Sequence, residues 1–217
     1  MVWRRSLRVG DRSDRRVDSP RASRYDRAVQ AFAYLSVLTS IVLGLGIARL
    51  LTGLGRLLQA RGRVRLYWVH MLWALNLLLF QTLTWWILFR WQSRMEWTFF
   101  LFMFLLLSPT ISFLLTVLLF PDPLPDGADL RQHYFANHRW FFTLGAILPP
   151  ADAVDTLLKG PEHLRAQGPL YVVFLAVVLV LMAIAACTRR AGFHAFFAVF
   201  FQVYLIVFIS VNLCVLA

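Results

Sequence analysis

The amino-acid sequence predicts an all-α integral membrane protein, a polytopic bundle of about six transmembrane helices. Of its 217 residues, 59% are apolar and only 15% are charged. A soluble domain of this composition would expose large apolar patches to water, which soluble proteins avoid because such patches associate. Apolar runs of about 20 residues, enough for a helix to cross a hydrocarbon layer about 30 Å thick, also recur along the chain. These runs lack the alternation of polar and apolar residues that a β-barrel requires.

Residues 1–28 are expected to form a disordered basic tail before the transmembrane helical domain of residues 29–217. Arginine alternates with aspartate and serine in this tail, and no apolar period could fold it. Moving arginine across a membrane potential costs about 2.3 kcal/mol per charge per 100 mV, which favours a cytoplasmic N-terminus in a plasma membrane, the inner membrane of a bacterium. The basic residues near the spans are almost equally divided between the two sides and add no second argument.

Five apolar runs are long enough to span, and a sixth, between the third and the fifth of these, is less regular. The predicted spans are residues 31–54, 66–89, 97–120, 140–158, 170–188 and 192–216. Pro149 and Pro150 interrupt the fourth, because proline lacks a backbone donor and disfavours helical geometry in the residue before it. We expect this helix to be kinked or broken at the pair, with Pro150 in the first turn of a new helix. The alternative is a five-span chain with a re-entrant fourth segment.

Small residues form a stripe along the first span, where they recur every four positions. The stripe consists of Ser36, Ser40, Gly44, Ala48 and Thr52. Such a stripe lets another helix approach closely, and close packing is the main attraction between helices in lipid. Because Ser108, Ser112 and Thr116 repeat this spacing in the third span, the first and third spans are predicted to pack together.

Asp152 and Asp155 are the only acidic residues inside an apolar run, and their spacing puts both on one helix face. Carboxylates in a membrane interior are typical of proton relays and cation sites, so these two are the main site candidates. A structural role is the alternative. Asp155 would then pair with Lys159 at i,i+4, and Asp152 would cap the segment after the prolines.

Arg49 is a third candidate, because a charge within an apolar run needs a partner, a water-filled cavity or a route to the headgroups. Three explanations are open. Its guanidinium could reach the headgroups, it could form an anion-binding face with Gly53 and Arg56, or it could pair with Asp152 or Asp155. In a six-span chain Arg49 and the aspartates lie near opposite faces, so a direct pair requires the five-span alternative.

Polar residues on the second and sixth spans predict an interior seam. His70 and Gln81 share a face of the second span, as His194 and Gln202 do in the sixth. Hydrogen bonds between helices explain such a seam without any ligand. Two facing histidines can also hold a haem iron, so His70 and His194 make a b-type cytochrome conceivable. Their spacing is not specific, and neither a metal nor a cofactor is predicted.

Several function classes are not supported by the sequence. No Walker loop, dinucleotide fingerprint, HExxH or GxSxG motif occurs, so a non-enzymatic function is favoured. The basic residues gather in the tail and in short loops, which is typical of membrane proteins and gives no reason to expect nucleic acid. The first hypothesis is a small transporter or channel for a proton, a cation or a small polar solute. The second is a non-transporting membrane subunit, sensor or assembly factor, whose partners are the lipid bilayer and another copy or another membrane protein.

Overall fold

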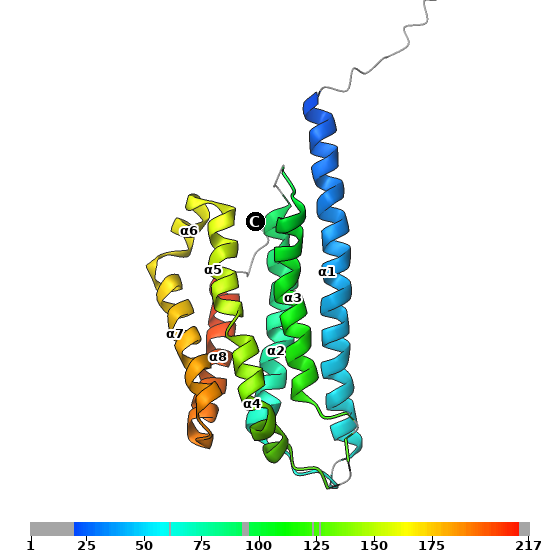
Figure 1. Cartoon of the computed structure of the whole chain (residues 1–217), viewed down its shortest axis with the longest axis vertical. Coiled ribbons are helices and arrows are strands. Elements are labelled where there is room, and N and C mark those ends of the chain that lie inside the picture. The colour runs from blue at the N-terminus through cyan, green and yellow to red at the C-terminus, as the bar shows by residue number, and fades with distance from the viewer. Residues whose placement is uncertain (1–19, 61, 93–95, 123, 126, 213–217) are drawn as a thin grey trace, which may run out of the picture.

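The computed structural model describes residues 20–60, 62–92, 96–122, 124–125 and 127–212, and within these ranges the chain is a helical bundle without strands (Figure 1). Six helical segments of this part are long and apolar enough to cross a bilayer. They are Arg24–Gln59, Trp68–Trp91, Phe99–Leu119, Leu130–Lys159, Pro169–Cys187 and Ala191–Ser210. The prediction of an all-α polytopic membrane protein with about six spans is therefore confirmed.

The first helix, α1 (Pro20–Gln59), is longer than the sequence predicts. Its 40 residues extend over about 60 Å at about 1.5 Å per residue, twice the thickness of a hydrocarbon layer. Residues 20–28, which we expected in the disordered tail, are helical, whereas residues 1–19 lie outside the described part. Burial of α1 against the bundle begins only at Ala28, and the ring of Phe32 lies 6.1 Å from that of Trp97, whereas residues 24–27 are helical and exposed.

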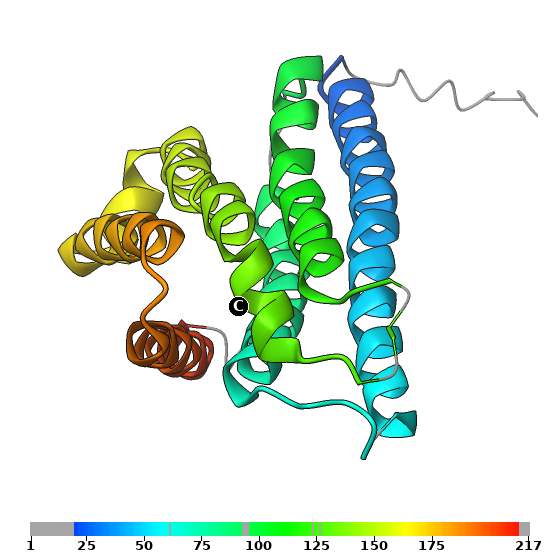
Figure 2. The same cartoon turned by 60° about the horizontal axis from the view of Figure 1, so that its bottom comes forward.

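Helix α1 packs mainly against α3 (Phe99–Leu119), as the sequence predicts, and the two ribbons run side by side in Figures 1 and 2. The contact face differs from the predicted one. The buried residues of α1 include Leu43, Leu50 and Leu57, whereas Gly44 of the predicted small-residue stripe is exposed and faces open space. The buried face of α1 therefore consists of larger apolar side chains at intervals of seven, together with Gly46 and Gly53, which lie outside the predicted stripe.

Helices α2 (Trp68–Leu88) and α8 (Ala191–Asn212) pack together and contribute to the main core. Trp73 lies at its centre and meets Phe141, Phe142 and Phe197 edge-on, with ring centroids 5.3 to 5.5 Å apart. Because Trp73 is in the first turns of α2, this aromatic core fills the half of the bundle far from the N-terminal end of α1. A short 3-10 helix, η1 (Phe89–Trp91), follows α2 at the opposite end.

The fourth span is broken into α4 (Leu130–Gly145) and α5 (Leu148–Lys159). The break falls at residues 146–147, just before Pro149 and Pro150, which both lie in the first turn of α5. Since neither proline has an N–H, the carbonyls of Gly145 and Ala146 lose their usual helical donors. The predicted interruption is thus present, and the prolines begin the second half of the span.

Helix α6 (Pro161–Gln167) and helix α7 (Pro169–Cys187) follow, each after a glycine. Gly160 and Gly168 have φ values of 109° and 74°, in the region that favours glycine, and a proline then starts the next helix. These turns place α6 across the end of the bundle and send α7 back along α4 (Figure 1). Because the chain has six spans, the N-terminal end of α1 and the C-terminal end of α8 lie on the same side of the bundle.

Candidate functional site

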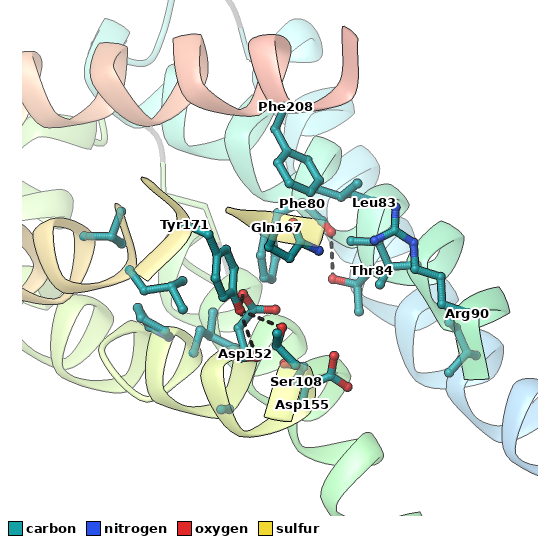
Figure 3. Close-up of a pocket in the computed structure, with 18 of the residues that line it drawn as sticks. Phe80, Leu83, Thr84, Arg90, Ser108, Asp152, Asp155, Gln167, Tyr171 and Phe208 are labelled. Atoms are coloured by element: carbon teal, nitrogen blue, oxygen red, sulfur yellow. Dashed lines mark hydrogen bonds between the residues drawn. The ribbon is translucent and has the colours of Figure 1, made fainter. Parts of the chain in front are cut away.

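Helix α5 brings Asp152 and Asp155 to a cavity of about 180 Å³. Helices α2, α3, α5, α7 and α8 contribute its walls, and α6 lies at its end (Figure 3). Most of the lining is apolar and aromatic, with a few polar groups that include Arg90, Lys159 and Tyr171. The cavity lies in the half of the bundle nearer the N-terminal end of α1, opposite the aromatic core around Trp73. An apolar cavity with few convergent polar groups is typical of a small-molecule site.

One hydroxyl group, that of Tyr171, holds Asp152. It donates to Oδ2 of Asp152 at 2.8 Å and also lies 3.1 Å from the main-chain carbonyl oxygen of Asp152. The Thr156 hydroxyl lies 2.8 Å from the Tyr171 oxygen and extends the network by one group. Within the described part of the chain, Asp152 has no ion pair with a cation. The capping role considered above is absent, because no side chain caps α5.

Asp155 is neutralised within its own helix. Lys159 forms with it the i,i+4 ion pair that the spacing predicts, and only 7% of the Lys159 side chain is exposed. Trp91 Nε1 donates to the other carboxylate oxygen at 3.0 Å, and the Lys159 ammonium lies over the Trp91 ring, 5.4 Å from its centroid. The two aspartates therefore differ: Asp155 is neutralised by a lysine, whereas the Asp152 carboxylate bonds to a single neutral hydroxyl group, that of Tyr171.

Arg49 pairs with a residue that the sequence argument missed. Its Nη1 lies 2.6 Å from Oδ2 of Asp122, and Nη1 of Arg56 lies 2.9 Å from Oδ1 of the same carboxylate. The hydrogen bonds from Arg49 and then Arg56 hold the pKa of Asp122 below its ordinary value. The predicted face of Arg49 and Arg56 does bind an anionic group, and this group is supplied by the chain. The alternative in which Arg49 pairs with Asp152 or Asp155 is wrong, because Arg49 pairs with Asp122. Asp122 belongs to the loop after α3, at the end of the bundle opposite these two aspartates.

Four of the five histidines, all except His163, gather at the end of the bundle opposite the cavity, as their positions in the spans suggest. The rings of His70 and His133 are 6.3 Å apart, and those of His138 and His194 are 5.8 Å apart. His194 Nε2 lies 3.0 Å from the Thr188 carbonyl and must donate to it. Its Nδ1 therefore accepts from the Tyr134 hydroxyl at 2.9 Å.

This arrangement argues against the haem alternative, because both ring nitrogens of His194 are occupied and none is available for iron. His70 is fully buried, and neither of its nitrogens has a partner among the described residues. No group of three or more His, Cys, Asp or Glu side chains in that part is arranged to hold a metal ion. His70 is thus a buried imidazole that has no hydrogen-bond partner in the described part of the chain.

The predicted polar seam is present as buried groups, but no hydrogen bond in the described part joins them. Gln81 is fully buried, and its side-chain amide lies against Gly46 of α1. A Cβ added at Gly46 would collide with this amide. Gln202 is half-buried, and its Oε1 has no partner among the described residues. The seam bond that does join α2 and α8 comes from Asn76, whose Nδ2 donates to the Ala198 carbonyl at 3.0 Å. The expected site residues therefore do not form one site: Asp152 and Asp155 line the cavity, whereas Arg49, His70 and His194 lie toward the opposite end of the bundle.

Comparisons of the chain with models of known families, with curated proteins and with solved structures find no match. The geometry of the site therefore carries the functional argument alone. Three partners of the expected site residues were not predicted from the sequence: Trp91 for Asp155, Tyr171 for Asp152 and Asp122 for Arg49. Trp91 and Tyr171 resemble ordinary interfacial aromatics in the sequence. Asp122 lies in a turn among prolines at the end of the third span. The one signal in the sequence for its pairing with Arg49 was that Asp122 is an acidic residue at the same depth as Arg49.

Proposed function

We propose that the protein is a small transporter for a solute with one positive charge, and that Asp152 is the carboxylate that binds it. The observation that carries this proposal is the unequal pairing of the two cavity aspartates. Lys159 neutralises Asp155, whereas the side chain of Asp152 bonds to the Tyr171 hydroxyl and has no ion pair among the described residues. A carboxylate in a largely apolar site is stabilised by a proton or by a cation. The transported solute would supply that charge.

The position of Asp152 supports a binding site within the membrane. Asp152 precedes Lys159, the last residue of α5, by about two turns, which is about 10 Å along the helix. It also follows the break between α4 and α5 by one turn. Broken helices commonly form the solute sites of transporters, because their irregular backbone must be covered by protein or by a water-filled cavity.

A carrier agrees better with this arrangement than an open channel. The cavity occupies one half of the bundle, and the aromatic core around Trp73 fills the other. A solute bound at Asp152 could leave toward that side only after the helices rearranged. We further propose that the N-terminus lies in the cytoplasm of a bacterium and the protein in its plasma membrane, in which case the cavity faces the cytoplasm.

Charge movement in proteoliposomes tests this function. The full chain is reconstituted, and currents are recorded after jumps in proton, sodium, potassium and alkylammonium concentration. We expect at least one of these cations to produce a current that Asp152→Asn abolishes. Asp26→Asn is the matched control, because Asp26 is an exposed carboxylate of α1 outside the cavity. An unchanged current in Asp152→Asn, or no current with any cation, would contradict the proposal.

The second candidate, a non-transporting subunit, sensor or assembly factor, is supported by the length of α1. Its first turns project beyond the other helices in Figure 1, and Tyr25 and Val29 there are 58% and 39% exposed. Another copy of the chain or another membrane protein could cover them. Co-purification of a partner in native lipid discs, lost when Tyr25 and Val29 are replaced by serine, would support this function over transport.

A further inference from the structure

We propose that the solute is a small organic ammonium compound whose apolar body is about the size of a benzene ring. This inference rests on the transport function proposed above and names the chemical class of its solute. Three features of the cavity support it: an ammonium group that the cavity wall already binds, a second carboxylate beside aromatic rings, and the size of the space.

Lys159 is an internal example of the proposed chemistry. Its ammonium group, at the end of an alkyl chain, pairs with the Asp155 carboxylate and lies over the face of Trp91. Trp91 also donates its indole N–H to that carboxylate and so fixes both binding groups. A carboxylate together with an aromatic face is the combination that proteins use for ammonium ligands. The wall of this cavity therefore already binds one alkylammonium group.

Asp152 offers a similar combination one turn earlier, without an ammonium group. Its Oδ2 accepts from the Tyr171 phenol, which leaves the other carboxylate oxygen for a ligand. Phe174 and Tyr204 line the same space and stack on each other, with ring centroids 3.3 Å apart and planes inclined by 12°. These rings provide the apolar and aromatic surface that the body of such a ligand would contact.

The size and composition of the cavity argue for an organic cation. An apolar cavity of about 150 Å³ is enough to hold benzene. At about 180 Å³ this cavity has room for a ring of that size and a short ammonium arm. A divalent cation such as Ca²⁺ needs about six to eight oxygen ligands, and the lining of the cavity is mostly apolar.

Two other polar groups bear on the class of ligand. Thr39, on the α1 side of the cavity, is 1% exposed, and its hydroxyl has no partner among the described residues. Because neighbouring atoms cover this hydroxyl, a ligand atom could satisfy it only after those atoms moved. Arg90 lines the cavity from η1, beyond the end of α2, and is exposed. Because Arg90 could instead attract an anion, the test includes an anionic probe.

Fluorine NMR on the full chain in detergent micelles tests the inference with three probes of one shape. These are 4-fluorobenzylamine, a cation at neutral pH, 4-fluorobenzyl alcohol, which is neutral, and 4-fluorophenylacetate, an anion. We expect saturable binding of the amine and binding of the alcohol that is at least about tenfold weaker, since a hydrogen bond to a charged group is the stronger one. Asp152→Asn should reduce the affinity for the amine to that for the alcohol. Asp26→Asn should retain amine binding in full, and Asp152→Glu, which keeps the negative charge, should bind the amine more tightly than Asp152→Asn does.

Equal affinities for the amine and the alcohol would overturn the inference, because the cavity would then bind apolar bodies without regard to charge. If 4-fluorophenylacetate bound more tightly than the amine, and Arg90→Gln abolished this binding, the inference would be overturned in favour of an anion site. Thermal unfolding of Asp152→Asn, compared with that of Asp152→Glu, separates loss of the site from loss of the fold. A current with protons or sodium that depends on Asp152, without amine binding, would refute this inference alone. Amine binding at Asp152 without any current would refute the transport function alone.

Discussion

The phenolic hydroxyl of Tyr171 donates a 2.8 Å hydrogen bond to Oδ2 of Asp152 and so connects α7 to α5. Because this phenol has one proton, the Thr156 hydroxyl must act as the donor to the Tyr171 oxygen. We predict that Tyr171→Phe lowers the free energy of unfolding by about 1 kcal/mol, since both bonds are lost. Thermal unfolding in detergent measures this. Tyr204→Phe is the matched control, because no hydrogen bond to the Tyr204 hydroxyl is found in the described part, and an equal effect of both changes would contradict the prediction.

Gly53 allows α1 to approach the loop after α3. A Cβ at this position would lie 2.6 to 2.8 Å from ring atoms of Phe120, which is buried. We predict that Gly53→Ala destabilises the protein by about 1 to 3 kcal/mol, the usual cost of overpacking. Gly44→Ala in the same helix meets no atom within 4 Å and should be neutral or slightly stabilising. Thermal unfolding of the two variants checks this, and similar midpoints would show that the contact with Phe120 is easily relieved.

Asp122 joins two arginines at the end of the bundle opposite the cavity. We predict that Asp122→Asn lowers the unfolding temperature, because Arg49 then loses its anionic partner near the end of an apolar run. Arg49→Gln should lower it less in the Asp122→Asn background than in the wild type, since the two groups act as a pair. Arg56→Gln provides a comparison, because the Arg56 side chain is more exposed. Additive effects of Asp122→Asn and Arg49→Gln would contradict direct pairing.

His163, in the short helix α6, should make stability depend on pH. Burial, followed by the charges of Lys159 and Arg90, lowers the pKa of His163 below its ordinary value of 6.5, and the charge of Asp155 opposes this. As the pH falls, His163 therefore binds a proton at a higher pH in the unfolded chain than in the folded one. The contribution of neutral His163 to stability is complete above pH 6.5 and is lost as the pH drops below it. Unfolding at about pH 7.5 and about pH 5.5, on either side of the ordinary imidazole value, should show a larger loss for the wild type than for His163→Gln. An equal loss would contradict the prediction.

The spans could be predicted from the sequence because the solvent imposes them. A lipid layer requires about 20 apolar residues in each crossing, and this requirement is local. The proline pair likewise acts locally, so the break before Pro149 could be expected. The start of α1 could not, because residues 24–27 are helical although they are exposed and carry no apolar period. The contact face of α1 was predicted wrongly, because it depends on contacts with distant parts of the chain, such as that between Phe32 and Trp97.

The site could be predicted only in part. The pair of Asp155 and Lys159 follows from their spacing on one helix. The bond from Tyr171 to Asp152 joins two helices across two glycine turns, and that from Trp91 to Asp155 joins α5 to η1. Such partners depend on how the helices pack, which no local pattern gives. Arg49 illustrates the same limit, because a charge in an apolar run indicates that a partner exists without indicating which.

The two prolines at the start of α5 also determine where this molecule can bend most easily. The carbonyls of Gly145 and Ala146 already lack helical donors, so fewer backbone hydrogen bonds hold this joint than hold an unbroken helix, and the bond from the Ala151 N–H to the Ile147 carbonyl remains. On one side of the joint, α4 is anchored in the aromatic core by Phe141 and Phe142. On the other side, α5 carries Asp152. A change of angle at this joint would therefore move the carboxylate relative to α4, and it would also move or break the bonds from Tyr171 to Asp152 and from Trp91 to Asp155.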